Sequence, residues 1–259
     1  DIGRKHGIPL VMDNTAAPVI CKPLEHGAAI VLHSLTKFIG GHGTSIGGIV
    51  VDGGNFDWIK DRKRQPLLNE PDQSYGGAVW TDAVPVLTGA NIPFVIRLRV
   101  VLLRDTGAPL APFNAWQIIQ GLETVGLRMK QHCANAEKVV TFLETQKKVK
   151  NVIYPTNHQG EIKERAKKYL QGGNGALVGA DLGTAEAGAK FIDNLKMLYH
   201  VANIGDARSL AIHPASTTHS QLNEKELLAA GVTPGYVRLS IGIEHPDDII
   251  SDIKQALAA

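Results

Sequence analysis

The side chains best suited to chemistry lie together between His33 and Gly48, in the run HSLTKFIGGHGTSIGG. Two hydroxyls, Ser34 and Thr36, precede one lysine, Lys37, and a glycine-rich turn follows. Because Ser34 and Thr36 are two positions apart, both hydroxyls would face the same side of an extended backbone, and Lys37 would point elsewhere. Glycines let a backbone approach a ligand closely. The run predicts a ligand that offers one group to hydroxyls and another to an amine.

Two phosphate-binding fingerprints fail in this run. A dinucleotide fingerprint started at Gly41 needs a third glycine where Ile46 stands. A P-loop fits the spacing from Gly43 to Gly48 but has Ile49 in place of its lysine. Hydroxyls for a phosphate and an amine for a carbonyl are the needs of pyridoxal phosphate held as a Schiff base. The run S-x-T-K alone is weak evidence, because a surface lysine beside Ser and Thr is common, but the sixteen-residue context makes the signal far stronger.

An acid and a cation elsewhere in the chain complete the set that this cofactor needs. Asp13 directly follows the apolar run 10–12, and ligands of open parallel sheets gather at the carboxyl ends of strands. It could pair with the ring nitrogen, or it could cap a turn, as Asp-Asn pairs often do. Arg238 is the charged residue in the apolar run YVRLS, and its fork suits a substrate carboxylate. The alternative for Arg238 is an internal salt bridge.

The elements that position these residues follow from the apolar pattern. Continuous apolar runs in the first part of the chain predict parallel strands buried on both faces. Residues 62–90 are rich in Pro, Gly, Asn, Asp and Ser and predict a long ordered loop. The strands are expected at 10–12, 29–33, 46–51, 151–154, 175–182 and 236–241, and the helices at 92–104, 113–146, 184–195, 224–230 and 246–257. This order predicts an α/β protein with a large domain over 1–112, a connecting helix over 113–146 and a small domain over 147–259.

Composition excludes several classes of protein. The net charge is +2, from 27 basic and 25 acidic residues, which argues against a dedicated nucleic-acid binder. The two cysteines, Cys21 and Cys133, are too few for a disulfide framework, and no apolar run is long enough to span a membrane. We therefore expect a cytoplasmic protein without membrane partners. The sequence offers no third ligand to join His213 and His219, so no metal site is expected.

The opening residues DIGRKHG are typical of a helix end capped by Gly7. Domains rarely begin on the last turn of a helix, so we expect the chain to be the C-terminal part of a longer protein. Residues 1–259 alone are then expected to be an incomplete enzyme, because a parallel sheet needs its faces and edges covered.

The chain resembles the Cys/Met-metabolism pyridoxal-phosphate enzymes, the cystathionine γ-synthase-like group, over its whole length. Within that group it is most similar to the O-acetylhomoserine sulfhydrylases. Relatives that cleave cystathionine or methionine carry Asn-Gly-His-Ser-Asp or Ser-Gly-His-Gly-Asp after the lysine, whereas this chain has Gly-Gly-His-Gly-Thr at 40–44. Further support comes from EPDQSY at 70–75, APFNA at 111–115, QGLET at 120–124, NIGDA at 203–207 and HPASTTH at 213–219.

The resemblance implies a fold type I, aspartate aminotransferase-like transferase, of which this chain holds the C-terminal part of the large domain and the small C-terminal α/β domain. It implies that Lys37 is the Schiff-base lysine and proton shuttle and that Asp13 pairs with the pyridinium. Ser34 and Thr36 would bind the phosphate. The substrate carboxylate would be held by Arg238, with Asn203 and Thr218 near it, although many relatives have Ser where Asn203 stands.

The activity implied is γ-replacement on O-acetyl-L-homoserine by sulfide, giving L-homocysteine and acetate, a step of methionine biosynthesis. The resemblance also implies a homotetramer with its site at a dimer interface, and a missing N-terminal segment that completes the site. The alternatives are an activity of the cystathionine γ-synthase or γ-lyase type, or a truncated fragment without catalysis.

Overall fold

The computed structural model describes residues 2–259 and divides into two compact units that alternate along the chain. The first unit comprises the chain up to Thr15, Lys22–Ser34 and Gly47–Ala115. The second comprises Ala16–Cys21, Leu35–Ile46 and Trp116–Ala259. The division reflects only how compactly the chain packs. The predicted domain boundaries at 112 and 146 therefore stay a prediction.

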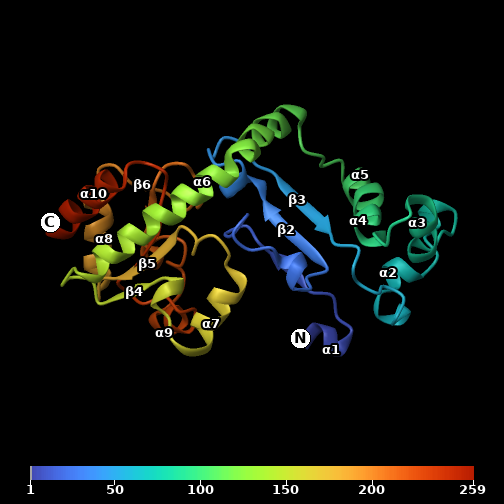
Figure 1. Ribbon diagram of the computed structural model, residues 1–259, viewed down its shortest axis with the longest axis horizontal. Helices are drawn as coiled ribbons and strands as arrows, with labels where there is room; N and C mark the ends of the chain where they lie inside the picture. The colour runs from blue at the N-terminus through green and yellow to red at the C-terminus, as the bar shows by residue number, and fades with distance from the viewer. Residues whose placement is uncertain (1) are drawn as a thin grey trace. The chain divides into compact units, whose positions relative to one another are not determined.

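The first unit is built on a three-stranded sheet in the order β1-β2-β3, which Figure 1 shows in blue. Strand β1 (Val11–Asp13) pairs parallel with β2 (Ile30–Ser34), and β2 pairs antiparallel with β3 (Gly48–Asp52). The expectation of parallel strands buried on both faces is therefore wrong for β3, and the residues of β1 are exposed. A continuous apolar run says that a strand is present but cannot say in which direction its partner runs.

In the sequence, one helix of the first unit precedes the three strands and the others follow them. They are α1 (Ile2–His6), α2 (Pro66–Asn69), α3 (Trp80–Thr88), α4 (Pro93–Arg97) and α5 (Arg104–Thr106). Buried Trp58, Leu68 and Trp80 form a core with the beginning of β2. The predicted loop over 62–90 is thus wrong, because it contains α2 and α3. Its loop-forming residues start helical turns instead: Pro66 opens α2, and Asp72 caps a short 3-10 turn by accepting from the Ser74 N–H at 3.0 Å.

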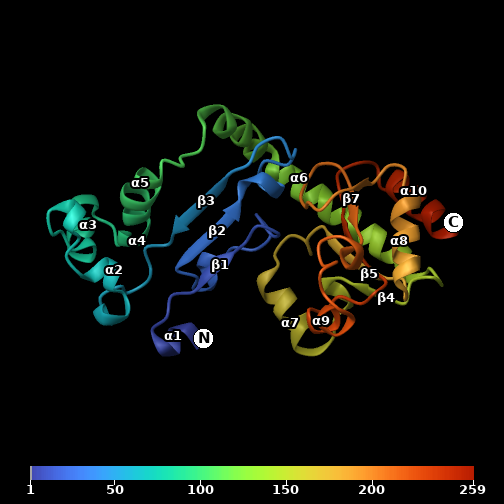
Figure 2. The same cartoon turned by 180° about the vertical axis from the view of Figure 1, so that it is seen from behind.

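The second unit holds a five-stranded sheet in the order β4-β5-β8-β7-β6, and Figure 2 labels β4, β5 and β7 of this sheet. Its neighbours pair antiparallel except β6 and β7, which are parallel. The strands are β4 (Asn151–Ile153), β5 (Leu177–Asp181), β6 (Tyr199–His200), β7 (Leu210–Ile212) and β8 (Tyr236–Ser240). The helices are α6 (Pro112–Glu144, which begins in the first unit), α7 (Gly160–Tyr169), α8 (Ala185–Asn194), α9 (Glu224–Ala229) and α10 (Pro246–Ala258).

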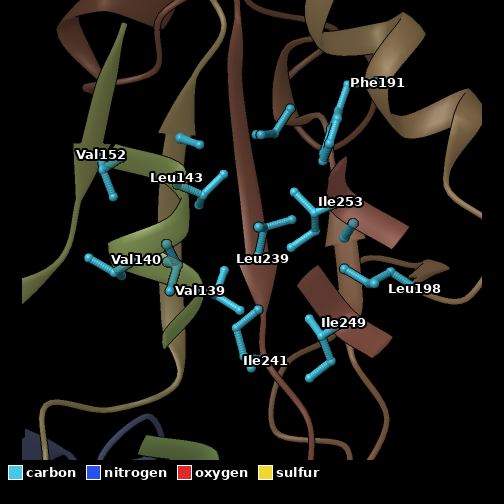
Figure 3. Close-up of a cluster of buried hydrophobic side chains, with 14 of the residues drawn as sticks. Val139, Val140, Leu143, Val152, Phe191, Leu198, Leu239, Ile241, Ile249 and Ile253 are labelled. Atoms are coloured by element: carbon cyan, nitrogen blue, oxygen red, sulfur yellow. The ribbon is translucent and has the colours of Figure 1, made fainter. Parts of the chain in front are cut away.

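The core of the second unit lies between this sheet and helices α6, α8 and α10. Figure 3 shows Leu143 of α6, Leu239 of β8, Phe191 of α8 and Ile253 of α10 turned toward one another. Leu239 and Ile253 are completely buried. The predicted long helix and the helices near 184–195, 224–230 and 246–257 are confirmed to within two residues at each end. Within residues 2–259 no single helix is long and apolar enough to cross a membrane, although α3 and the helical segment 93–106, bent by 100° to each other, pass that test as a pair.

The side chain of His132 on α6 should make the protein less stable in acid. His132 is completely buried, its Nδ1 lies 2.6 Å from the carbonyl oxygen of Ile241, and its ring meets Phe38 edge-on at 5.4 Å. Desolvation lowers the pKa of His132 from 6.5 to about 4. The unfolded chain therefore binds more protons between these two values, and the free energy of unfolding falls as pH drops from 6.5 toward 4. At pH 5 the loss is on the order of 2 kcal/mol.

Urea unfolding at pH 7.5 and pH 5 tests this expectation. His132→Phe should lose that part of the pH dependence, while His200→Gln, a change at an exposed histidine, should retain it. An unchanged difference between the two pH values in His132→Phe would show that His132 does not cause the acid sensitivity.

Candidate active site

Lys37 lies in a kinked turn that directly follows β2. The strand ends at Ser34, and Leu35–Ile39 forms a short helical turn interrupted at Lys37, where φ is −89° and ψ is −130°. The turn closes on itself, because the Gly40 N–H donates to the Leu35 carbonyl at 2.8 Å and the Gly41 N–H donates to the Lys37 carbonyl at 2.7 Å. The prediction that Ser34 and Thr36 share an extended backbone is therefore wrong. The strand stops before Thr36, and a helical turn has no two-residue alternation.

Three of the predicted residues meet in the second unit. The Lys37 ammonium group donates a hydrogen bond to the side-chain oxygen of Asn203, which lies between β6 and β7. The main-chain carbonyl of Asn203 accepts a hydrogen bond from Nη2 of Arg238 at 3.3 Å. Asn203 thus connects an amine and a guanidinium that are far apart in the sequence.

Arg238 has no carboxylate partner within residues 2–259. None of the ion pairs found there includes it, so the structure does not support an internal salt bridge. Its neighbours on β8, Val237 and Leu239, are fully buried on the core side, so Arg238 extends from the opposite face of the sheet. A cavity of about 530 Å³ lies there, between α7 and the strands β4, β5 and β8, and Arg238 lines it. Burial lowers the pKa of Arg238, as expected for a half-buried cation that lacks a counter-charge.

The loop that carries Asn203 is fastened on both sides. The Gly205 N–H donates to the Ser240 hydroxyl at the end of β8 at 3.0 Å. The Ala207 N–H donates to the Gly41 carbonyl in the turn after Lys37 at 2.8 Å. A side chain at Gly205 would collide with the backbone of Phe38, and Gly205 has a positive φ of 74°, so glycine is required there. The loop therefore fixes Asn203 relative to Lys37 and to β8.

Asp13 and Ser34 lie in the first unit, at the carboxyl ends of β1 and β2. These strands are parallel neighbours, so their ends lie at the same edge of the sheet. Asp13 accepts from the Thr15 N–H at 2.9 Å, and the Thr15 hydroxyl accepts from the Ser34 N–H at 2.8 Å. Hydrogen bonds from the side chain and then the backbone of Thr15 hold the pKa of Asp13 below its ordinary value, so the carboxylate is ionised near neutral pH. Asp13 caps a turn and also presents a negative charge.

Thr218 is exposed on the turn that follows the 3-10 helix Pro214–Ser216. Its hydroxyl shares a hydrogen bond of 2.9 Å with the ring of the next residue, His219, rather than with Asn203 or Arg238. The structure therefore brings Lys37, Asn203 and Arg238 together in one unit and does not bring Thr218 to them.

The donor set fits pyridoxal phosphate. Lys37 offers an amine held by an amide oxygen, Asp13 an ionised carboxylate, and Ser34 and Thr36 hydroxyls on either side of the start of the turn. Sequence reasoning missed Thr15, which orders the ends of β1 and β2, and Arg128, which binds the turn after Lys37. The one signal for Arg128 was a charged residue between the apolar Leu127 and Met129 of the predicted helix.

Comparison with known proteins indicates the same cofactor. Residues 1–258 match the family model described as "Cys/Met metabolism PLP-dependent enzyme". The O-acetyl-L-homoserine sulfhydrylase of Leptospira meyeri is 50% identical over 262 residues, which cover 99% of this chain and 59% of that protein. An O-acetyl-L-homoserine sulfhydrylase of Thermus thermophilus is 45% identical over 98% of this chain and 60% of its own length.

A solved structure is similar over the whole chain. It is a protein from Campylobacter jejuni described as an O-acetylhomoserine (thiol)-lyase, and it contains a pyridoxyl-lysine monophosphate. Its TM-score is 0.89 at 40% identity, covering 100% of this chain and 61% of that one. This chain spans about 59% of the length of the curated relatives it matches. On this match the chain has the fold of a PLP-dependent enzyme, and it belongs to the Cys/Met metabolism PLP-dependent enzyme family, whose cofactor is pyridoxal phosphate.

Proposed function

We propose that the protein replaces the acetate group of O-acetyl-L-homoserine by sulfide, which gives L-homocysteine and acetate. The bond from the γ-carbon to the ester oxygen breaks, acetate takes the bonding electrons, and hydrosulfide forms the new carbon–sulfur bond. The observation that carries the proposal is that Asn203 holds the Lys37 amine and the Arg238 guanidinium together. An amine for proton transfer beside a fork for a carboxylate suits an amino-acid substrate. The names of the relatives support the choice of substrate.

Each residue has a distinct task in this proposal. When bound, pyridoxal phosphate supplies an electron sink for the carbon atoms of the substrate. Lys37 holds the cofactor and moves protons to and from the substrate, while Asn203 fixes the position of its amine. Asp13 keeps the ring nitrogen protonated, and Ser34 and Thr36 bind the phosphate. Arg238 binds the substrate carboxylate, and Thr218 would reach the same carboxylate only if its turn moves.

The proposal extends to the assembly of the protein. It is a cytoplasmic homotetramer whose active site is completed at a dimer interface by a segment outside residues 1–259. Exposed apolar side chains in the first unit support a contact between subunits. Val86 and Leu87 of α3 are more than four-fifths exposed, at 85% and 81%. The near absence of cysteine supports a reducing compartment.

Three reactions of the purified, cofactor-loaded protein distinguish the alternatives. With O-acetylhomoserine and sulfide, we expect homocysteine and acetate in equal amounts. Cystathionine formed from cysteine in place of sulfide, at a higher kcat/KM, would favour the synthase alternative. Oxobutanoate and ammonia formed without any nucleophile would favour the γ-lyase alternative, and no turnover at all would favour a fragment without catalysis.

Arg238→Lys should raise the KM for the amino-acid substrate by about tenfold or more. A charge-assisted hydrogen bond contributes about 1.5–3 kcal/mol, and a lysine cannot reproduce the two parallel bonds of the arginine fork. Steady-state kinetics measure this change. Arg62→Lys is the matched control, because Arg62 is an exposed arginine bound to Asp82 in the first unit, and it should leave KM unchanged. An unchanged KM in Arg238→Lys would mean that the carboxylate binds elsewhere.

A further inference from the structure

We propose that Arg128 on α6 is a positioning residue that fixes the turn of Lys37 by binding its main-chain carbonyls. The inference rests on the proposed function in one respect, that Lys37 is the residue that holds the cofactor. It adds a role for a residue that touches neither Lys37 nor Arg238 in the cluster around Asn203.

The guanidinium of Arg128 binds the two carbonyls that directly follow Lys37. Nη1 donates to the Phe38 carbonyl at 2.6 Å, and Nη2 donates to the Ile39 carbonyl at 2.9 Å. Nη2 also donates to the Gly121 carbonyl at 2.7 Å, and Nε donates to the Thr124 hydroxyl at 3.1 Å. The carbonyls of Leu35 and Lys37 are taken by N–H groups of the turn itself, so Arg128 supplies the donors that the turn lacks for the next two.

Close packing brings the guanidinium and the turn together. A Cβ atom at Gly41 would collide with the Arg128 guanidinium, and one at Gly121 would collide with the carbonyls of Ile39 and Gly40. Gly41 also has a positive φ of 74°, which disfavours any larger residue. Glycines on both surfaces therefore let α6 lie directly against the turn. This contact leaves Lys37 little freedom to shift along α6.

Arg128 is a costly residue to place here for stability alone. It is only 6% exposed, and burial lowers its pKa with no carboxylate among residues 2–259 contributing an opposing effect. Taking an uncompensated charge out of water is expensive, and an apolar side chain would avoid the cost. An apolar side chain would, however, leave two buried carbonyls without donors. The planar fork of arginine satisfies both at once and fixes their directions.

The same face of α6 also holds the end of the strand that carries Arg238. His132 lies one helical turn after Arg128 and contacts the Ile241 carbonyl at 2.6 Å. Asn135 lies a further turn along and donates to the carbonyls of Gly242 at 3.0 Å and Glu244 at 2.8 Å. One row of buried polar side chains therefore sets the position of the Lys37 turn and of the end of β8. Within this row, Arg128 holds the Lys37 turn, and His132 and Asn135 hold the end of β8.

Kinetics and spectra of the cofactor-loaded protein test the role of Arg128. Arg128→Met should lower kcat about 10- to 100-fold, since small misplacements of a reacting group have effects of this size, and should leave the KM for the amino-acid substrate within about twofold. The pH midpoint of the visible absorption band of the bound cofactor should move by about half a unit or more. Arg128→Lys should give a smaller change in the same direction. Thr124→Val removes the acceptor for Nε together with the 3.3 Å hydrogen bond from the Thr124 hydroxyl to the Gly121 carbonyl. It should do the same and serves if Arg128→Met does not fold.

Asp252→Asn is the matched control for lost stability. Asp252 is buried in the same unit and accepts hydrogen bonds from the N–H groups of Lys196, Met197 and Leu198. Its replacement should lower the melting temperature but move neither kcat nor the pH midpoint. Variants of Arg128 and Thr124 that lower only the melting temperature would overturn the inference. A wild-type protein without a lysine-linked cofactor band, or a Lys37→Ala variant that keeps it, would instead overturn the proposed function.

Discussion

Lys37→Ala is expected to lose the visible absorption band of the lysine-linked cofactor and to lower turnover by at least about 10³-fold, because in the proposed function one side chain both holds the cofactor and transfers protons. The structure supports this double use. The Lys37 amine is half-buried and held by the side-chain oxygen of Asn203, within the cluster that contains Arg238. Absorption spectroscopy and the rate of homocysteine formation measure the two losses on the same sample.

Lys22→Ala controls for the removal of a lysine. Lys22 is exposed and pairs with Glu25 at 3.2 Å on the surface of the first unit, so neither the spectrum nor the rate should change. A Lys37→Ala protein with the wild-type spectrum and full activity would refute the assignment of Lys37.

Asp13→Asn is expected to lower kcat by about 100-fold or more while the protein still binds pyridoxal phosphate. The substitution keeps the shape of the side chain, and its amide oxygen can still accept from the Thr15 N–H, so the turn after β1 should persist. What disappears is the negative charge that we propose keeps the ring nitrogen protonated. Electrostatic stabilisation of developing charge typically contributes effects of this size. Cofactor binding by fluorescence and kcat by product formation separate the two roles of Asp13.

Asp57→Asn is a control with the same local structure. Asp57 is an exposed aspartate that accepts from the N–H groups of Ile59 and Lys60 at 3.2 and 3.1 Å, so it caps a turn as Asp13 does. It should leave kcat unchanged. If Asp13→Asn also leaves kcat unchanged, Asp13 only caps its turn.

Elements with a strong periodic pattern could be predicted from the sequence, and elements without one could not. Helix α6 repeats apolar residues over nine turns and was expected almost to the residue. Helix α7 carries only Ile162, Ala166 and Tyr169 at helical spacing among charged residues, and none of its residues is buried, so its apolar pattern is weak. Strand β7 is fully buried but only three residues long, which is too short for a pattern.

The site could be predicted only where neighbouring residues define it. Lys37 was found because two hydroxyls precede it and a glycine-rich turn follows it, and Asp13 because it follows an apolar strand. Both signals are local in the chain. The hydrogen bond between Lys37 and Asn203 joins residues separated by 166 positions, and only the fold brings them together. Arg128 could not be assigned because its partners are main-chain carbonyls, which every residue has and no sequence pattern distinguishes.

Chemical trapping of the cofactor tests the central claim most directly. The cofactor-loaded protein is reduced with borohydride, which converts a lysine–cofactor linkage into a stable pyridoxyl-lysine, and its peptides are then mapped by mass spectrometry. We expect the pyridoxyl phosphate on the peptide that contains Lys37 and on no other. Modification of a different lysine, or an active protein without any modified lysine, would contradict the account.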